Sequence, residues 1–495
     1  MALPELIEIV PLDKPVKAEI TVPGSKSITN RALILAALAD GEVILKGALW
    51  SEDTQIMVDC LRDLGFMVNV APEPDEICNR TITVYGTGGA VPPGGTESQP
   101  LDLFVGNAGT AARFLAPFLC LGSGVYRLHG VPRMHERPQA ALFQALRELG
   151  YRVEAEFEND KLPVKIFSGT AGQAPESMTE FIARKQIPPV PKQCRVSIAE
   201  SSQFASALLL SAEIGGWDVE VEGENADESP YVVMTQKLIA AFPKKGGKFQ
   251  IEPDASSGSY FIAAAKFVHR EKAETSDPAK KREKPVVVAH WPDSGWQIDQ
   301  EFPNVLRRSF GHLLQLAMEK KGNINEPLPI EEIHALLAPL PVTAKISRQH
   351  DLGDSIMMAI CLAPRDIGPV QFIDLGRLRL QECERVYSLR TELTKCGAKV
   401  VEEGDTLTVY PSKPEELHGA EIETYNDHRM AMCFAILGLK IPGIRIKNPA
   451  CVKKTFPNFF QKLAGPPPNG LGAEIWEIKN GQRTRKLSGD DLFAD

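Results

Sequence analysis

The sequence has little of what marks several large classes of protein. Its 495 residues include nine cysteines, with no C-x-x-C pair and no His/Cys cluster at zinc spacing, so reduced and mostly buried thiols are expected. It contains no run of about eighteen apolar residues, and its first residues lack the pattern of a signal or transit peptide. The formal net charge of −9 disfavours a nucleic-acid binder. A globular cytoplasmic protein is expected.

Internal similarity is the strongest architectural feature of the sequence. A chain of this length exceeds what one hydrophobic core usually serves, so two domains are expected. One pattern recurs six times: a polar turn, then a helix of small apolar residues, then a short β-branched strand. These units begin at Gly24, Gly106, Glu200, Asp254, Asp351 and Asn426.

The predicted helices are of two kinds. Stretches such as ALILAALA, ASALLLSA and MAMCFAILGL are apolar nearly all round, which is typical of helices buried under a sheet. The stretches 54–65, 138–150 and 386–397 are amphipathic and end in Gly before a strand, as outer helices do. The expected fold is α/β, with two domains of three βαβ-like repeats and Ser, Asn or Asp at the helix N-caps.

Two stretches fall outside this scheme. Residues 269–285 form a run of charges that is expected to be a solvated surface loop. From Gly465 the sequence GPPPNGLG is typical of a linker, and the remainder to Asp495 is expected to be a polar tail open to disorder.

Basic residues gather at the turns that open the helices, although the protein as a whole is acidic. Lys26, Ser27 and Arg31 lie in GSKSITNR, which lacks the first Gly of a nucleotide P-loop. Asn107 and Gly109 lie in GNAGTAAR and offer backbone donors at a helix start.

Further candidate residues follow at later turns and loops. They are Arg113, Arg133, Arg137, Ser201, Ser202, Gln203, Arg385, Arg429 and Lys454. Two guanidiniums in one loop can clamp an oxyanion. Asp354 and Glu382 are candidate acid–base groups, although an Asp at a helix start is often only a cap. Together these residues predict that two anionic, phosphorylated small substrates bind in a cleft between the domains.

Several motifs in this order resemble the 5-enolpyruvylshikimate-3-phosphate synthases, within the enolpyruvyl transferase family. They are GSKSITNRAL, GNAGTAARFL, PRMHERP, SSQF, PDASS, ECERV, YNDHRMAMCF and KTFPNFF. The resemblance runs from about Val10 to Leu463. It implies a two-domain inside-out α/β barrel in which each domain has three βαβαββ units. The domains would comprise 1–22 with 253–464, and 23–252, followed by the tail 465–495.

The resemblance also implies a reaction and roles for residues. The family transfers the enolpyruvyl group of phosphoenolpyruvate to the 5-hydroxyl of shikimate 3-phosphate, releasing phosphate, without a metal or organic cofactor. Asp354 would accept the hydroxyl proton, Glu382 would exchange the proton at the methylene carbon, and Lys26 would assist. The expected shikimate 3-phosphate residues are Lys26, Ser27, Arg31, Ser201, Ser202, Gln203, Ser229, Tyr231, Asp354 and Gln381. The expected phosphoenolpyruvate residues are Lys26, Asn107, Gly109, Arg133, Gln203, Arg385, Arg429 and Lys454.

Three positions depart from the family pattern. Gln381 stands where Lys commonly precedes the catalytic Glu, and Arg377 stands where Asn is usual. We expect Arg377 to supply the charge that Gln381 lacks. Phe114 replaces a common Pro, and its bulk is expected to shift the N–H groups of Asn107 and Gly109 and to reduce inhibition by glyphosate.

Three alternatives stay open at this point. A UDP-N-acetylglucosamine enolpyruvyl transferase shares the fold and the donor, but it usually carries a loop cysteine that VPRMHERP lacks. A non-catalytic relative that senses phosphorylated metabolites is the second alternative. An enolpyruvyl transferase whose acceptor is only shikimate-like is the third. The expected partners are the two small-molecule substrates, with no nucleic acid or membrane, and the protein is expected to be a monomer.

Overall fold

The computed structural model describes residues 3–169, 192–223, 229–268, 286–321, 332, 336–337, 342 and 344–494. The chain divides into two compact units. Unit 1 comprises Met1–Pro23 and Pro253–Asp495, and unit 2 comprises Gly24–Glu252. Within the described ranges, no helix is both long and apolar enough to cross a membrane. The charged loop expected at 269–285 lies outside the described residues.

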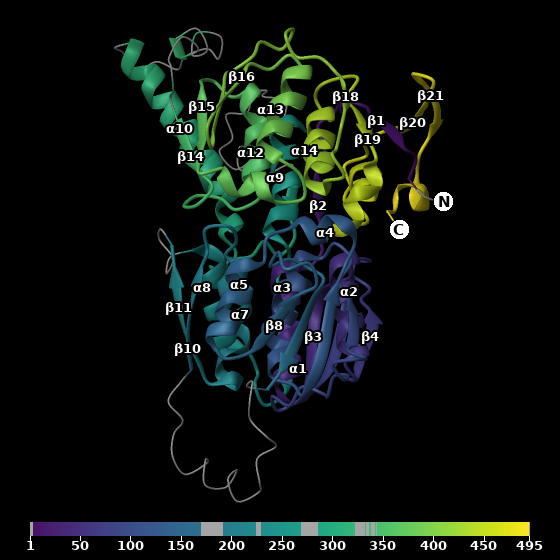
Figure 1. The fold of residues 1–495 in the computed structure, drawn as a ribbon. Coiled ribbons are helices and arrows are strands. Elements are labelled where there is room, and N and C mark those ends of the chain that lie inside the picture. The colour runs from purple at the N-terminus through teal and green to yellow at the C-terminus, as the bar shows by residue number, and fades with distance from the viewer. Residues whose placement is uncertain are drawn as a thin grey trace, which may run out of the picture. The chain divides into compact units, whose positions relative to one another are not determined.

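The described part of unit 2 contains three sheets (Figure 1). The first has the order β12-β3-β5-β4, formed by Gly247–Gln250, Asp40–Leu49, Asn79–Thr87 and Val68–Pro72. The second has the order β6-β7-β9-β8, formed by Leu101–Phe104, Gly124–His129, Val164–Ser168 and Arg152–Ala155. The third pairs β10 (Lys192–Ser197) with β11 (Trp217–Glu222) in parallel.

Each sheet of unit 2 is accompanied by a buried helix and a second helix. The buried helices are α1 (Lys26–Leu38), α3 (Gly109–Cys120) and α7 (Gln203–Gly215). Every residue of α3 is buried, and α1 is buried from Ile28 onward. The second helices are α2 (Glu52–Asp63), α5 (Ala140–Glu148) and α8 (Pro230–Ala241), and a short helix α4 spans Pro132–Glu136. The apolar all-round helices therefore form the core of the unit.

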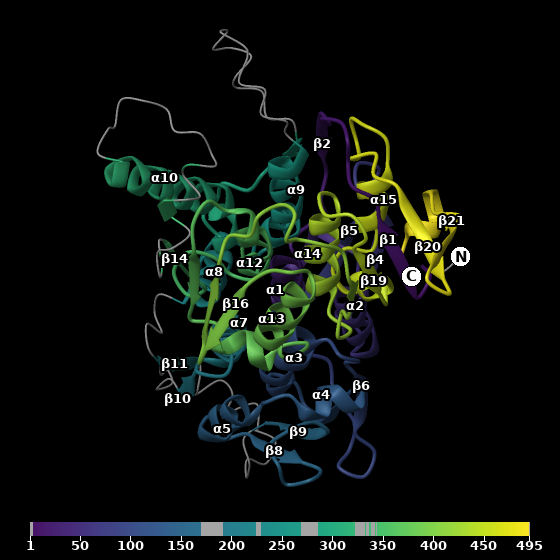
Figure 2. The same cartoon turned by 90° about the horizontal axis from the view of Figure 1, so that it is seen from above.

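Unit 1 repeats this plan in its described part. Its sheets have the orders β13-β2, β14-β15-β17-β16 and β18-β19-β1-β20-β21. Their strands are, in the same order, Val286–Val288, Ala18–Ile20, Ala344–Ser347, Val370–Ile373, Thr406–Val409, Val400–Glu403, Glu421–Ile422, Arg445–Lys447, Leu6–Ile9, Ile475–Lys479 and Gln482–Lys486. The buried helices α9 (Ala255–Val268), α12 (Ile356–Leu362) and α14 (His428–Gly438) pack together (Figure 2). The other helices are α10 (Phe302–Lys321), α13 (Arg385–Lys395) and α15 (Phe459–Ala464).

The structure confirms the helices predicted from the pattern. All six apolar stretches that follow polar turns are helices, and each is followed along the chain by a strand. The amphipathic stretches are α2, α5 and α13. Gly65, Gly150 and Gly397 follow them with φ of 96°, 87° and 85°, in the left-handed region that glycine adopts at helix ends. All nine cysteines are free, and eight of them are buried, as the absence of paired motifs predicted.

The prediction that polar side chains cap the buried helices is wrong for most of them. Ser25, Ser202 and Ser355 precede α1, α7 and α12, but none of them makes a side-chain cap hydrogen bond. Side-chain capping occurs at α14, where Asp427 accepts from the N–H of Arg429, and at α9, where Asp254 accepts from the N–H of Ser257. A serine before a helix caps it only where its side chain bonds the helix backbone, which composition alone does not reveal.

The expected disorder of the tail is also wrong. Strands β20 and β21 form a hairpin beside β1, and the sheet is completed at the end of the chain (Figure 1). Asn480 and Gly481 connect the two strands with φ of 50° and 78°, as in the two-residue Asn-Gly turns that join the strands of a β-hairpin. Glu8 of β1 accepts hydrogen bonds from Arg483 and Arg445 at 2.6 and 2.9 Å. Arg483 of the tail therefore pairs with a charged residue of another strand in the same sheet.

Candidate active site

Lys26 is the first residue of α1 in unit 2. Its Nζ lies 3.0 Å from the Oδ2 of Asp53, a buried residue in the first turn of α2. The Lys26 side chain is 17% exposed, so its ammonium combines a buried counterion with access to solvent. Sequence reasoning missed Asp53 because an acid in the first turn of a helix ordinarily serves only the helix dipole.

Arg31, one turn further along α1, is buried without a carboxylate in ion-pair contact among the described residues. Its Nε donates to Thr235 Oγ1 at 2.7 Å, and its two Nη atoms donate to Ser27 O and Ser206 Oγ at 2.9 and 3.0 Å. Burial lowers the pKa of Arg31 to about 10, because a charge removed from water is destabilised. A buried guanidinium with neutral partners favours binding of an anion.

The turn GNAG brings Asn107 and Gly109 together with Arg137. Arg137 donates from Nη1 to the backbone oxygen of Asn107 at 3.3 Å. A Cβ at Gly109 would lie 2.6 Å from the same Nη1, so only glycine allows the guanidinium to lie against this helix start. The Asn107 Oδ1 is buried without a hydrogen-bond partner among the described residues, and it is therefore available to a ligand.

The other expected residues of unit 2 have different surroundings. Gln203 accepts from Arg113 at 2.7 Å, which links the starts of α7 and α3. Ser201 Oγ accepts from the Gln203 N–H at 3.2 Å. Ser229 precedes α8 and is buried, and its Oγ has no partner among the described residues. Arg133 is 49% exposed and paired with Glu136, so the structure does not bring it into contact with the other candidates.

Asp354 lies at the centre of a charged cluster in unit 1. Its carboxylate is 3.0 Å from Arg348, 3.0 Å from Arg429 and 3.9 Å from Arg385, and the Gln381 amide lies 3.5 Å away. Burial acts to raise the pKa of Asp354, but the three arginines hold it well below its usual range. The side chain therefore carries a negative charge at neutral pH.

Glu382 lies in the same cluster, on the turn that leads into α13. Its two oxygens are 2.8 Å from Arg385 Nη2 and 3.1 Å from Lys454 Nζ. Arg385 is almost fully buried and also pairs with Asp427, from Nε at 2.7 Å. Burial disfavours the charge of Arg385, but the carboxylates around it raise its pKa above its usual value. The guanidinium thus connects Glu382 with the start of α14.

The cluster in unit 1 unites the candidates expected in this half of the chain. They are Asp354, Gln381, Glu382, Arg385, Arg429 and Lys454. The structure adds Arg348 and Asp427, which sequence reasoning did not assign to the site. Arg348 has no motif around it, whereas Asp427 stands in YNDHRMAM and was interpreted only as a helix start. The cluster gathers four cations, Arg348, Arg385, Arg429 and Lys454, and such a local concentration of positive charge suits anions.

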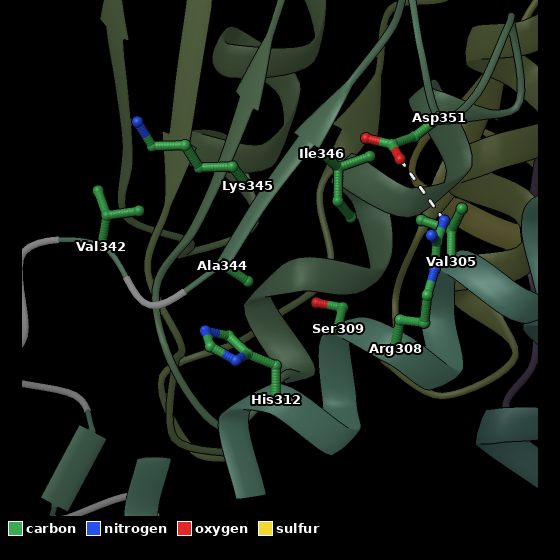
Figure 3. A pocket seen from close by; sticks show the side chains of 9 residues that line it. All are labelled: Val305, Arg308, Ser309, His312, Val342, Ala344, Lys345, Ile346 and Asp351. Carbon is green, nitrogen blue, oxygen red and sulfur yellow. Dashed lines mark ion pairs between the residues drawn. The ribbon is translucent and has the colours of Figure 1, made fainter. Parts of the chain in front are cut away.

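A cavity of about 460 Å³ lies elsewhere in unit 1, between α10 and β14 (Figure 3). Arg308 points toward Asp351 across its edge, with 3.5 Å between the charged atoms. The described lining also includes His312 and Lys345, but neither Asp354 nor Glu382. The cavity is therefore separate from the charged cluster, although Asp351 belongs to the turn that precedes Asp354.

Comparisons of this sequence with known proteins agree on one family. The family model described as EPSP synthase (3-phosphoshikimate 1-carboxyvinyltransferase) matches residues 11–463. A 3-phosphoshikimate 1-carboxyvinyltransferase of Trichormus variabilis is 35% identical over 479 residues, which cover 93% of this chain and 98% of that protein. The enzyme of this name from Opitutus terrae is 35% identical over 492 residues, covering 94% of this chain and 98% of the relative. An EPSP synthase structure from Acinetobacter baumannii has the same fold, with a TM-score of 0.59, 19% identity, and coverage of 95% of this chain and 100% of that one.

Proposed function

We propose that this chain, which belongs to the EPSP synthase (3-phosphoshikimate 1-carboxyvinyltransferase) family, transfers the enolpyruvyl group of phosphoenolpyruvate to the 5-hydroxyl of shikimate 3-phosphate and releases phosphate. Beyond the family membership, one observation carries the proposal. Two carboxylates, Asp354 and Glu382, lie among four cations in unit 1. This is the inventory that a reaction of anions with two separate proton transfers requires.

The chemistry assigns different work to the two carboxylates. Protonation of the methylene carbon of phosphoenolpyruvate makes the adjacent carbon electrophilic, and the 5-hydroxyl oxygen bonds to that carbon. Asp354 accepts the hydroxyl proton, and Glu382 exchanges the proton on the methylene carbon. The resulting intermediate loses phosphate by cleavage of its carbon–oxygen bond, and the double bond re-forms when a proton leaves the methyl group. No metal or organic cofactor is required by this sequence of steps.

Charged and polar side chains are assigned to each of the two substrates. The residues assigned to phosphoenolpyruvate are Lys26, Asn107, Gly109, Arg133, Gln203, Arg385, Arg429 and Lys454. Arg31, Ser27 and Lys26 are assigned to shikimate 3-phosphate, as are the serines Ser201, Ser202 and Ser229, together with Tyr231 and Gln203. Each charge-assisted contact contributes about 1.5–3 kcal/mol, and fixed orientation of the reactants lowers the entropic part of the barrier.

The test is release of inorganic phosphate from phosphoenolpyruvate by the purified protein. We expect release with shikimate 3-phosphate, and background release with shikimate, with UDP-N-acetylglucosamine or without an acceptor. Mass spectrometry of the product should show the mass of the acceptor plus an enolpyruvyl group. Glu382→Gln serves as the inactive comparison. Phosphate release that depends on the UDP-sugar would assign the other enolpyruvyl transferase reaction. Binding of shikimate 3-phosphate without any turnover would favour a metabolite sensor.

A further inference from the structure

Arg348 is held in place by a hydrogen-bonded turn at the end of β14. Its own N–H donates to Ile373 O of the neighbouring strand at 3.1 Å. The residue before it, Ser347, donates its N–H to Asp351 Oδ2 at 2.8 Å. Ser347 Oγ then accepts from the N–H groups of Gln349 and His350, each at 3.1 Å. The backbone that carries Arg348 is therefore fixed on both sides.

The side chain of Arg348 leads from this turn to Asp354. It is only 7% exposed, and its Nη2 lies 3.0 Å from Asp354 Oδ1. Its Nε is buried without a hydrogen-bond partner among the described residues. Burial of a guanidinium costs the free energy of its hydration unless a paired charge compensates the loss. Its pairing with Asp354 supplies the compensating interaction.

Asp354 is fixed from its other side. The N–H groups of Gly353 and Ser355, which flank it, both donate to Asp299 Oδ1, at 2.7 and 3.3 Å, and the Ser355 hydroxyl donates to the same oxygen at 2.6 Å. Asp299 is itself buried. Both members of the Arg348–Asp354 pair therefore stand on rigid backbone, six residues apart in the same turn.

The remaining cations around Asp354 have other tasks under the proposed function. Arg429 and Arg385 are assigned to phosphoenolpyruvate, whose carboxylate and phosphate compete with Asp354 for them. Gln381 reaches Asp354 with its amide at 3.5 Å, but an amide carries no charge. Of the cations that contact Asp354 in the described part of the chain, Arg348 is the one to which the proposed function assigns no substrate.

We propose that Arg348 is a positioning residue, which orients the carboxylate of Asp354 and supplies the positive charge that Gln381 lacks. The sequence-based expectation gave this role to Arg377. That residue lies half-buried in the short 3-10 helix η4 (Gly376–Leu380). This inference rests on the proposed function, because it concerns the base of the same reaction.

The pH dependence follows from the groups that face Asp354. They are the cations Arg348, Arg385 and Arg429, the neutral Gln381, and the acids Glu382 and Asp299. The arginines depress the pKa of Asp354, so loss of one arginine raises it. A base acts only in its deprotonated form, and the acidic limb of kcat/KM for the acceptor must then move to higher pH.

The experiment compares Arg348→Gln, Arg348→Lys and Arg377→Gln, with Arg308→Gln as a matched control. Arg308 also pairs with an aspartate of this turn, but its side chain is 67% exposed. We expect Arg348→Gln to lower kcat at least about tenfold and to move the acidic limb upward by about one to two pH units. The KM for phosphoenolpyruvate should change much less. Arg348→Lys should retain most of the rate, and Arg308→Gln should match the wild type.

A double variant keeps the test independent of folding. Gln381→Lys, introduced into the Arg348→Gln protein, should recover much of the rate by restoring a charge beside Asp354. An unchanged acidic limb in a folded Arg348→Gln protein would overturn the proposal, as would a larger loss in Arg377→Gln than in Arg348→Gln. A wild-type protein that releases no phosphate with both substrates would instead refute the proposed function itself.

Discussion

Replacement of Asp427 tests how much one buried carboxylate of the charged cluster contributes to the stability of the fold. It is fully buried, pairs with Arg385 at 2.7 Å, and caps α14 by accepting from the Arg429 N–H at 2.8 Å. Asp427→Asn removes the charge and keeps the shape. An asparagine oxygen can still cap the helix, since Asn and Asp are about equally good at that position.

The size of the expected loss in stability depends on the partners that Arg385 retains in the Asp427→Asn protein. Loss of one partner of a buried ion pair costs about 3–5 kcal/mol, because the other charge is left uncompensated. Arg385 retains Glu382 at 2.8 Å, and the new amide oxygen can accept one hydrogen bond. We therefore expect a decrease of about 2–3 kcal/mol in the free energy of unfolding of unit 1.

Urea unfolding and hydrogen exchange measure this effect together. The unfolding midpoint should fall, and exchange should accelerate in α13 and α14. Asp405→Asn is the control in the same unit, because Asp405 pairs with Arg379 at 3.0 Å but is 60% exposed. Its loss should be below about 1 kcal/mol. Equal losses in the two variants would refute the reasoning that burial sets the strength of these pairs.

Two further predictions concern charge at the ends of the helices. Lys26→Met should lower kcat/KM at least about 100-fold, because phosphate oxygens lose a charged partner; steady-state kinetics measure this, and wild-type rates would remove Lys26 from the site. Asp354→Asn should destabilise the protein more at pH 7 than at pH 2.5. The pKa of Asp354 is lower in the folded state than in the unfolded state. The ionised carboxylate therefore contributes its full stabilisation of the fold above the unfolded-state pKa of about 4, and this contribution decreases as the pH falls below it. Urea midpoints at the two pH values measure the difference, and an equal loss at both would contradict it.

The helices could be predicted because their signals are local. The apolar stretch in α14 spans 11 residues, which is longer than a typical buried strand and therefore favours a helix, and its side chains can be hidden only in a core. The glycines at 65, 150 and 397 mark helix ends by a conformation that other residues avoid. Both features are contained within a dozen residues, and both were confirmed.

Tertiary partners were harder to predict. Nothing around Arg348 announces that its side chain is buried against Asp354, because this depends on β14 pairing with β15 and on the turn that follows. Strand β20 pairs with β1, some 470 residues away in sequence, and the polar composition concealed it. The Asn480–Gly481 dipeptide was a local signal of that hairpin, and the alternation of apolar and charged residues before it (Trp476, Glu477, Ile478 and Lys479) is typical of a strand.

Phe114 illustrates how the structure redirects an expectation. The sequence suggested that its bulk would shift the N–H groups of Asn107 and Gly109. In the structure the ring is fully buried, and the Arg31 guanidinium lies over it with 5.1 Å between Cζ and the ring centroid. A cation–π contact contributes about 0.5–1 kcal/mol at an exposed site and about 2 kcal/mol or more when it is desolvated.

Replacement of this ring should therefore affect the acceptor more than the donor, since Arg31 is assigned to shikimate 3-phosphate. We expect Phe114→Leu to raise the KM for shikimate 3-phosphate about three- to tenfold, and that for phosphoenolpyruvate less than about twofold. Phe118→Leu is the matched control, because Phe118 is equally buried in α3 but contacts the Phe66 ring at 5.8 Å. It loses a similar volume without touching a guanidinium, so it should lower stability and leave both KM values near those of the wild type. A larger change in the KM for phosphoenolpyruvate than in that for the acceptor would contradict this prediction. It would favour the sequence-based expectation that Phe114 affects the phosphoenolpyruvate site.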